Sequence, residues 1–341
     1  MDTIIFIIRR LINALFTLFL LIVIIFVLIH IIAPTPEALA RIYASSPHVP
    51  PQALQAIIQK YGLNKPLYIQ ILTYIWNLLH GNLGFDPYYK APELSVIMRF
   101  LPITLELVIP ATILAVVLGI LTGAIAAANR NKPIDYIVRG VYLATWAAPP
   151  FFVAIILQLI IAYYLHLLPP YGLFNPSLTA PKDITPFPLI NGIITGDWPF
   201  VISMIRHMVL PMITLAIISF GIVTRITRAT MIDYMESDFA RLSIMKGLPR
   251  RRVVYGVVLR NASIPIVTLI ALLFGYSVAG AVVVEEIFQY EGMGYFITQA
   301  IFNLDYIAIL GTTIIIGISI IIANLVADLL YGLLDPRVRL S

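Results

Sequence analysis

The sequence predicts an all-α integral membrane protein with six transmembrane helices and long external loops. Of its 341 residues, 60% are hydrophobic and only 11% are charged, whereas soluble domains average about 45–50% and about 25%. Six stretches approach or exceed the roughly 20 apolar residues that a helix needs to cross a bilayer. None shows the alternating pattern of a membrane β-barrel strand. This composition excludes a soluble enzyme.

Each predicted span is almost free of ionisable side chains, the exception being His30 near the end of the first. The fourth stretch is short, but Arg206 and His207 at one end and Arg225 at the other can extend their charged tips to the membrane surface. The six predicted spans are roughly 11–33, 107–129, 140–165, 208–224, 264–284 and 306–327.

The first span has features of a secretory signal peptide, because Arg9 and Arg10 precede it and Ala38-Leu39-Ala40 follows it. The apolar core of a signal peptide is about 7–15 residues long, and this stretch exceeds 20. We therefore expect a retained membrane anchor.

The distribution of lysine and arginine predicts the orientation. Two basic residues precede the first span, three lie between the second and third, eight lie in 225–263 and two follow the sixth span. Fifteen of the 22 basic residues thus fall on the side that holds both termini. We predict a multi-pass plasma-membrane protein with cytoplasmic termini. The net charge of +5 then reflects topology and does not indicate nucleic-acid binding.

Several kinds of chemistry have no support in the sequence. There is no cysteine, and the five histidines occur singly without metal-ligand spacing. No GxxxxGK[ST] element is present to cradle nucleotide phosphates. We predict no catalytic residue, no metal site and no cofactor on this chain.

Two external segments are long enough to fold. Residues 34–97 carry helical patterning around Leu54, Ile57 and Tyr61, then a turn and a second apolar stretch at 67–79; residues 166–207 are rich in proline. They are either caps packed over the spans or a binding surface. The predicted division is 1–33 for the tail and first span, 34–97 for the external loop, 98–332 for the core and 333–341 for a cytoplasmic tail.

The cytoplasmic loop at 225–263 contains a short helix with both ends marked. Asp238 suits the N-cap position, Gly247 suits the position after the helix, and Pro249 prevents its continuation. Phe239, Leu242 and Met245 form one apolar stripe. A helix of about eight residues is marginal alone and cannot span a bilayer. It must dock on lipid, on its own bundle or on a partner protein.

Ten segments along the chain form a recognisable series. They are Tyr61-Gly-Leu-Asn-Lys-Pro66, Gly81-Asn-Leu-Gly84, Leu101-Pro-Ile-Thr-Leu-Glu-Leu107, Leu210-Pro211, Thr224-Arg-Ile-Thr-Arg228, Asp238-Phe-Ala-Arg-Leu-Ser-Ile-Met-Lys-Gly247-Leu-Pro249, Arg260-Asn-Ala-Ser-Ile-Pro265, Gly280-Ala-Val-Val-Val-Glu285, Gly292-Met-Gly294 and Asp328-Leu-Leu-Tyr-Gly-Leu-Leu-Asp-Pro-Arg337. Together they resemble the ABC importer permeases of the dipeptide, oligopeptide and nickel group. One departure lies at Arg241-Leu242-Ser243, where the family signature begins with an acidic residue and two alanines.

The resemblance implies a type I importer, with this chain as half of the pathway. A second related permease would complete the pore, two ATPase subunits would bind ATP and Mg²⁺, and an external solute-binding protein would deliver peptides, oligosaccharides or a nickel complex. The short helix would be the coupling helix seated on an ATPase. Its implied coupling residues are Asp238, Phe239, Arg241, Leu242, Met245, Lys246, Gly247 and Pro249. The sequence predicts no cargo-binding residue.

A stand-alone secondary transporter or channel is the alternative. Ion-coupled carriers usually place carboxylates or histidines near mid-membrane, and no predicted span has one at its centre. Glu106 is expected at the outer start of the second span, hydrogen-bonded or paired with Arg99. Glu285, Glu286 and Glu291 form either a solvated acidic rim or a surface for cationic cargo or a binding protein.

Overall fold

The computed structural model describes residues 3–44 and 49–334, which are mostly helical. One antiparallel pair of two-residue strands is present among them, and residues 165–187 form an irregular connection between helices. The predicted tail at 333–341 lies mostly outside the described residues. The first half contains α1 (Thr3–Ile32), α2 (Pro36–Tyr43), α3 (Pro51–Tyr61), α4 (Leu67–Leu79), β1 (Phe85–Asp86), β2 (Ala91–Pro92), α5 (Glu93–Ala128), α6 (Pro133–Ala147), α7 (Pro150–Leu157) and the π-helical η1 (Gln158–Tyr164). The second half contains α8 (Pro188–Thr195), α9 (Trp198–Met235), α10 (Asp238–Met245), α11 (Arg250–Arg252), the π-helical η2 (Val253–Val258), α12 (Leu259–Ile287), α13 (Met293–Phe302) and α14 (Tyr306–Leu334).

Within the described residues, four helices are long and apolar enough to cross a membrane: the 11–32 part of α1, then α5, α9 and the 306–326 part of α14. Two bent pairs raise the number to six if each pair forms one span. The all-α membrane fold predicted from composition is therefore confirmed.

Two of the predicted spans differ in shape from the expectation. The stretch at 140–165 is not straight, because the chain turns by 104° between α6 and α7. Pro149 and Pro150 sit at this break, where proline removes a helical hydrogen bond and clashes with the preceding turn. The stretch predicted at 208–224 belongs to a much longer helix, since α9 has 38 residues and extends into both flanking segments.

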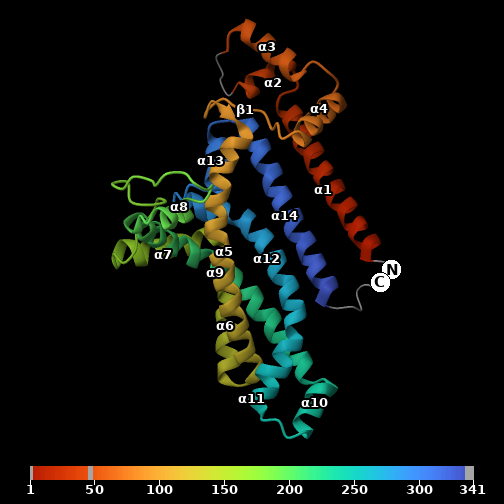
Figure 1. Ribbon diagram of the computed structural model, residues 1–341, viewed down its shortest axis with the longest axis vertical. Helices are drawn as coiled ribbons and strands as arrows, with labels where there is room; N and C mark the ends of the chain where they lie inside the picture. The colour runs from red at the N-terminus through yellow and green to blue at the C-terminus, as the bar shows by residue number, and fades with distance from the viewer. Residues whose placement is uncertain (1–2, 45–48, 335–341) are drawn as a thin grey trace.

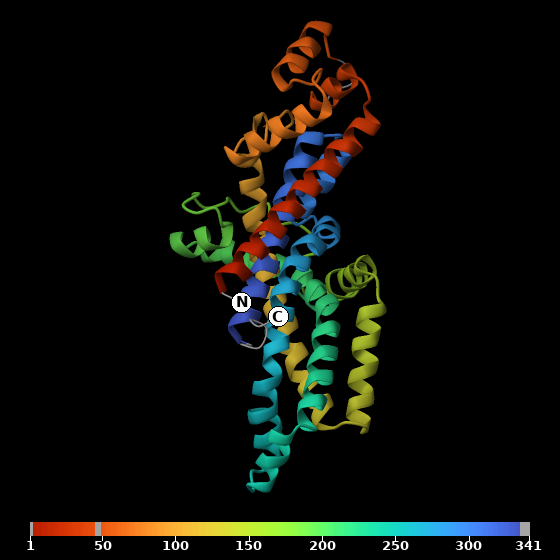
Figure 2. The same ribbon diagram turned by 90° about the vertical axis from the view of Figure 1, so that its right-hand side faces the viewer.

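The elements separate into two ends (Figure 1). Helices α2, α3 and α4 gather at one end, hereafter the cap end, while α10 and α11 lie at the opposite end, hereafter the tip end. The hairpin of α9 and α12 carries α10 well beyond the starting end of α1. Both views place α1 beside α14 (Figure 2), and Ile22 and Phe26 share a buried cluster with Leu310 and Ile314.

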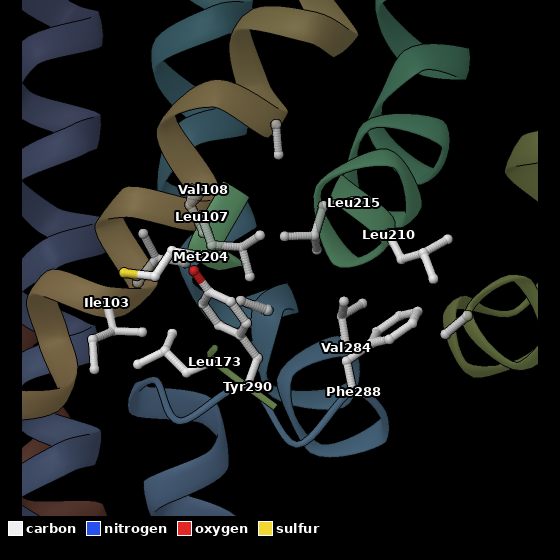
Figure 3. Close-up of a cluster of buried hydrophobic side chains, with 14 of the residues drawn as sticks. Ile103, Leu107, Val108, Leu173, Met204, Leu210, Leu215, Val284, Phe288 and Tyr290 are labelled. Carbon is white, nitrogen blue, oxygen red and sulfur yellow. The ribbon is translucent and has the colours of Figure 1, made fainter. Parts of the chain in front are cut away.

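The central core lies between α5, α9 and the end of α12 (Figure 3). Leu107, Met204 and Tyr290 meet there and are almost completely excluded from solvent. Farther toward the tip end, α5 and α9 pack at backbone distance. A Cβ at Gly119 would lie 2.5 Å from that of Val223, and one at Gly123 would lie 2.7 Å from that of Thr227. The glycines of α5 therefore let the two long helices approach closely.

Candidate functional site

The N-terminus of α10 differs from the prediction. Ser237, not Asp238, occupies the N-cap position with extended backbone, and its hydroxyl bonds to the carbonyl of Tyr234 instead of capping α10. Asp238 is the first helical residue. There its carboxylate still favours the helix, because the first turn presents unpaired N–H groups and a partial positive charge.

The C-terminus of α10 is the predicted glycine stop, and this prediction is confirmed. Gly247 has φ of +79°, a left-handed conformation that costs other residues roughly 1–2 kcal/mol. Its N–H donates to the carbonyl oxygen of Ile244 at 2.9 Å. The N–H of Leu248 donates to the carbonyl oxygen of Ser243 at 3.3 Å. These two bonds form a Schellman motif. Pro249 follows directly and begins the turn into α11.

The predicted single stripe of Phe239, Leu242 and Met245 is wrong. Phe239 turns inward, with its ring 5.8 Å from that of Tyr234, and joins the cluster around buried Ala240. Leu242 and Met245 instead face solvent, with 49% and 78% of their surfaces exposed. The period of three gives the spacing of apolar residues but not which of them meets the bundle. The helix therefore has one anchored face and one free apolar face.

The free face carries charge beside its apolar side chains. Ile244, which the sequence reasoning did not select, is 59% exposed. Asp238, Arg241 and Lys246 are also exposed. These three large apolar residues and the three charged ones form a mixed exposed surface on an eight-residue helix.

The base of the tip is tied to the turn between α5 and α6. Arg130 in this turn pairs with Glu236, directly before α10. Arg250, the first residue of α11, donates to the carbonyl of Ala128, the last residue of α5, at 3.3 Å. Both flanks of α10 thus contact the chain where α5 ends and this turn begins.

A buried ion pair fixes α6 to α9 in the same region. Asp135 is fully buried and accepts two hydrogen bonds from Arg228, Nε to Oδ1 at 2.6 Å and Nη2 to Oδ2 at 2.8 Å. The N–H of Asn131 adds a third bond at 2.9 Å. This paired fork geometry is the strong form of an arginine–carboxylate contact.

Near the cap end, Glu285 has a role that the sequence reasoning missed. It is fully buried rather than part of an acidic rim. It accepts from the Thr104 hydroxyl at 2.7 Å, the Gly294 N–H at 2.6 Å and the Tyr295 N–H at 3.3 Å. The carboxylate therefore caps α13 and ties it to α5. A Cβ at Gly294 would lie 2.3 Å from the Cα of Val282, so only glycine permits this approach.

Three further carboxylates are buried at the cap end, and several of their oxygens accept no hydrogen bond. Asp86, Glu93 and Asp305 are all buried, and at least one oxygen of each lacks a hydrogen-bond partner. Burial raises the pKa of Asp86, and burial raises the pKa of Asp305 to about 6. Among residues 3–44 and 49–334, no group of histidine and acidic residues has the arrangement of a metal site.

Glu106 accepts a hydrogen bond from the N–H of Leu189 at 3.0 Å, which joins α5 to α8. The expected structural hydrogen bond is thus present, with a backbone partner in place of Arg99.

Comparison with protein families decides the affiliation. Residues 119–340 match the family described as "Binding-protein-dependent transport system inner membrane component", and residues 3–108 match the N-terminal region described for the same class of membrane components. The chain belongs to this family. It is a multi-pass inner-membrane permease component of a binding-protein-dependent transport system.

Curated relatives match the permease over almost its full length. A probable D,D-dipeptide transport system permease protein of Escherichia coli K12 is 34% identical over 318 residues, 93% of this chain and 92% of the relative. The dipeptide permease protein of the same strain is 33% identical over 336 residues, 98% of each chain. An oligopeptide permease protein of Haemophilus influenzae is 33% identical over 337 residues, 98% of this chain and 99% of the relative.

The permease signature segments acquire physical roles in the structure. The segment Leu101–Leu107 contains Thr104, and the segment Gly292–Gly294 contains Gly294. Both residues donate hydrogen bonds to Glu285, which ends the segment Gly280–Glu285. Three segments that are far apart in the sequence thus form one hydrogen-bonded network. The presence of all three segments in one chain was the sequence signal for this network. Which of their residues form hydrogen bonds becomes visible only in the fold.

Proposed function

We propose that this permease forms half of the transmembrane pathway of an ABC importer for peptides. A second, related permease forms the other half. Two cytoplasmic ATPase subunits bind ATP and Mg²⁺ and hydrolyse the nucleotide, and an external solute-binding protein delivers the cargo. The tip end and both termini face the cytoplasm, in keeping with the fifteen basic residues on that side.

The free face of α10 is the observation that carries the proposal. Leu242, Ile244 and Met245 are exposed on α10, which lies at the tip end of the hairpin of α9 and α12. A protein groove with an apolar floor and an acidic rim would cover these side chains and pair with Arg241 and Lys246. An ATPase subunit is the partner that a binding-protein-dependent permease requires at this end.

The anchoring of α10 supports a mechanical role. Movement of the ATPase groove would be transmitted through α10 to α9 and α12, because the Ala240 cluster includes Met231 of α9 and Ala262 and Ile266 of α12. The Arg228–Asp135 pair would carry the same displacement to α6. Opening of the pathway would then follow from rigid-body movement of these helices.

Peptides are the proposed cargo because the relatives described above are named as dipeptide and oligopeptide permeases. An oligosaccharide cargo has no comparable support. A stand-alone carrier is disfavoured by the free face of α10, which would leave an apolar surface in water.

The proposal is tested by purifying the permease from its native membrane in mild detergent. We expect a second permease and two ATPase copies to co-purify, and the complex to import a labelled dipeptide into liposomes only with ATP and binding protein. Transport by this chain alone would overturn the proposal.

A further inference from the structure

Helix α4 has apolar residues on two faces, and only one of them has a partner. Ile71, Tyr74 and Leu78 pack into the cluster shared with α1 and α14. A second set at spacings of four, four and three lies on another face of the same helix. This second set, the α4 stripe, consists of Tyr68, Leu72, Trp76 and Leu79, which are 64%, 60%, 65% and 75% exposed.

The third face of α4 is polar and points elsewhere. Gln70, Thr73 and Asn77 line a cavity of about 150 Å³ between the cap helices and the cap-end parts of α1 and α14. The helix thus separates its polar residues from the α4 stripe. No charged residue occurs in its 13 residues. A helix of this length cannot span a bilayer, and one with such segregated faces suits a membrane interface.

The depth of α4 along α1 is the second line of argument. The ring of Tyr74 lies 5.1 Å from that of Phe26, six residues before the end of α1 at Ile32. Six residues of α-helix correspond to about 9 Å, and an interfacial helix lies about 5–10 Å into the boundary between headgroups and acyl chains. Because α1 crosses the membrane, its contact with α4 sets the level of α4.

The exposed apolar surface of α1 continues to this level. Leu28, Ile31 and Ile32 are 53%, 71% and 64% exposed at the cap end of α1. Tyr68 and Trp76 add aromatic rings with polar tips, the residue types enriched where a membrane meets water. The α4 stripe therefore adds to the exposed apolar surface at the cap end of α1.

We propose that α4 is an interfacial helix whose stripe is embedded in the lipid leaflet at the cap end, with the polar face turned to the cavity. The lipid anchors the cap helices at the surface of the membrane. This inference goes beyond the transport function and does not depend on which cargo or partners the permease has.

The absence of cysteine from the chain makes a direct test simple. Single variants Leu72→Cys and Leu79→Cys on the stripe, and Thr73→Cys on the polar face as the matched control, are labelled with a nitroxide in the complex purified from membranes. The labelled complexes are placed in nanodiscs of phosphatidylcholine and phosphatidylglycerol. Power-saturation EPR then measures collisions with oxygen, which concentrates in acyl chains, and with a water-soluble nickel chelate.

We expect the labels at Leu72 and Leu79 to collide with oxygen and to be shielded from the nickel chelate, and the label at Thr73 to show the reverse. A stripe label as accessible to the chelate as the Thr73 label would mean that the stripe is in water and would overturn the proposal. Shielding from both reagents would also overturn it, because a protein surface would then cover the stripe. The two stripe positions are independent, so failure of one variant to assemble leaves the other decisive.

Discussion

Buried carboxylates are handled differently at the two ends of the permease. At the tip end, Asp135 meets a guanidinium in a two-bond ion pair. At the cap end, Glu285 is satisfied by a hydroxyl and backbone N–H groups without a cation, while Asp86, Glu93 and Asp305 keep unpartnered oxygens. The tip end therefore holds a fixed charge pair, whereas the cap end holds acids whose charge depends on protons and neutral donors.

This contrast follows from where the chain places its basic residues. Most lysines and arginines lie on the side assigned to the cytoplasm, so an inward-facing carboxylate there can find a cation. Few basic residues are available at the cap end. Carboxylates buried there rely on helix N-termini or on a raised pKa.

The largest expected effect comes from breaking the tip-end pair with Asp135→Ala. The substitution leaves the Arg228 guanidinium without its partner in a mostly buried position, and such a loss costs about 3–5 kcal/mol. We expect a marked fall in the Tm of the detergent-solubilised complex. The control Arg130→Ala removes the exposed pair with Glu236, which is worth about 0–1 kcal/mol. Equal effects of the two variants would mean that Asp135 is not an anchoring residue.

A smaller loss is expected at the cap end from Glu285→Ala. The Gly294 N–H and the Thr104 hydroxyl lose their acceptor, and an unsatisfied buried donor costs about 1–3 kcal/mol. No charge is left behind, so the Tm should fall less than with Asp135→Ala. The exposed neighbour Glu291 provides the control, and Glu291→Ala should leave the Tm unchanged. A Glu285→Ala variant with the same Tm as the wild type would contradict the capping role.

The expected effect of Gly247→Val is local. A β-branched residue at positive φ strains the turn by roughly 1–2 kcal/mol or more, which redirects α10 while the spans still insert. We expect normal membrane levels, weaker ATPase co-purification and loss of the ATP hydrolysis stimulated by loaded binding protein. Gly140→Val is the matched control, since a Cβ there also meets open space but the backbone is ordinary helix. Full stimulation of ATP hydrolysis in the Gly247→Val variant would mean that this turn takes no part in coupling.

The smallest effect should be a change in pH dependence. The pKa of Asp305 rises from 3.8 to about 6 in the folded protein, so the folded state binds its proton more tightly than the unfolded state. The resulting stabilisation is present below about pH 4 and is lost as the pH rises through 6. Asp305→Asn keeps an oxygen for the Ala308 N–H but does not titrate. Its Tm relative to wild type should rise between pH 4 and pH 8, and a constant difference would contradict the assignment.

The sequence predicts the fold through local signals. Apolar length identifies α1 and α14, Gly247 and Pro249 mark the end of α10, and the patterned stretch at 67–79 becomes α4. Proline was a usable signal at Pro149, although its presence alone does not give the 104° bend. These features depend on neighbouring residues, which a single sequence displays directly.

The sequence does not show which residues that are far apart along the chain contact each other. Asp135 and Arg228 are 93 positions apart, and Thr104 and Glu285 are 181 apart. Nothing in their spacing along the chain links the two residues of either pair. The helices that carry them are brought together by apolar packing, and the apolar pattern of a helix does not show which residues of another helix lie opposite. The same limit explains the stripe of α10, where only the packed bundle decides that Phe239 turns inward and Met245 outward.

The central claim is that the free face of α10 docks on an ATPase subunit, and photocrosslinking from that face tests it most directly. Met245→Cys, the only thiol in the chain, is labelled with a benzophenone maleimide in native membranes and irradiated, with Ser177→Cys as the control at an exposed position in another loop. We predict that the Met245 variant forms a covalent product with an ATPase subunit, identified by mass spectrometry, and that the Ser177 variant does not. A Met245 probe that reacts only with lipid or with its own chain would contradict the account.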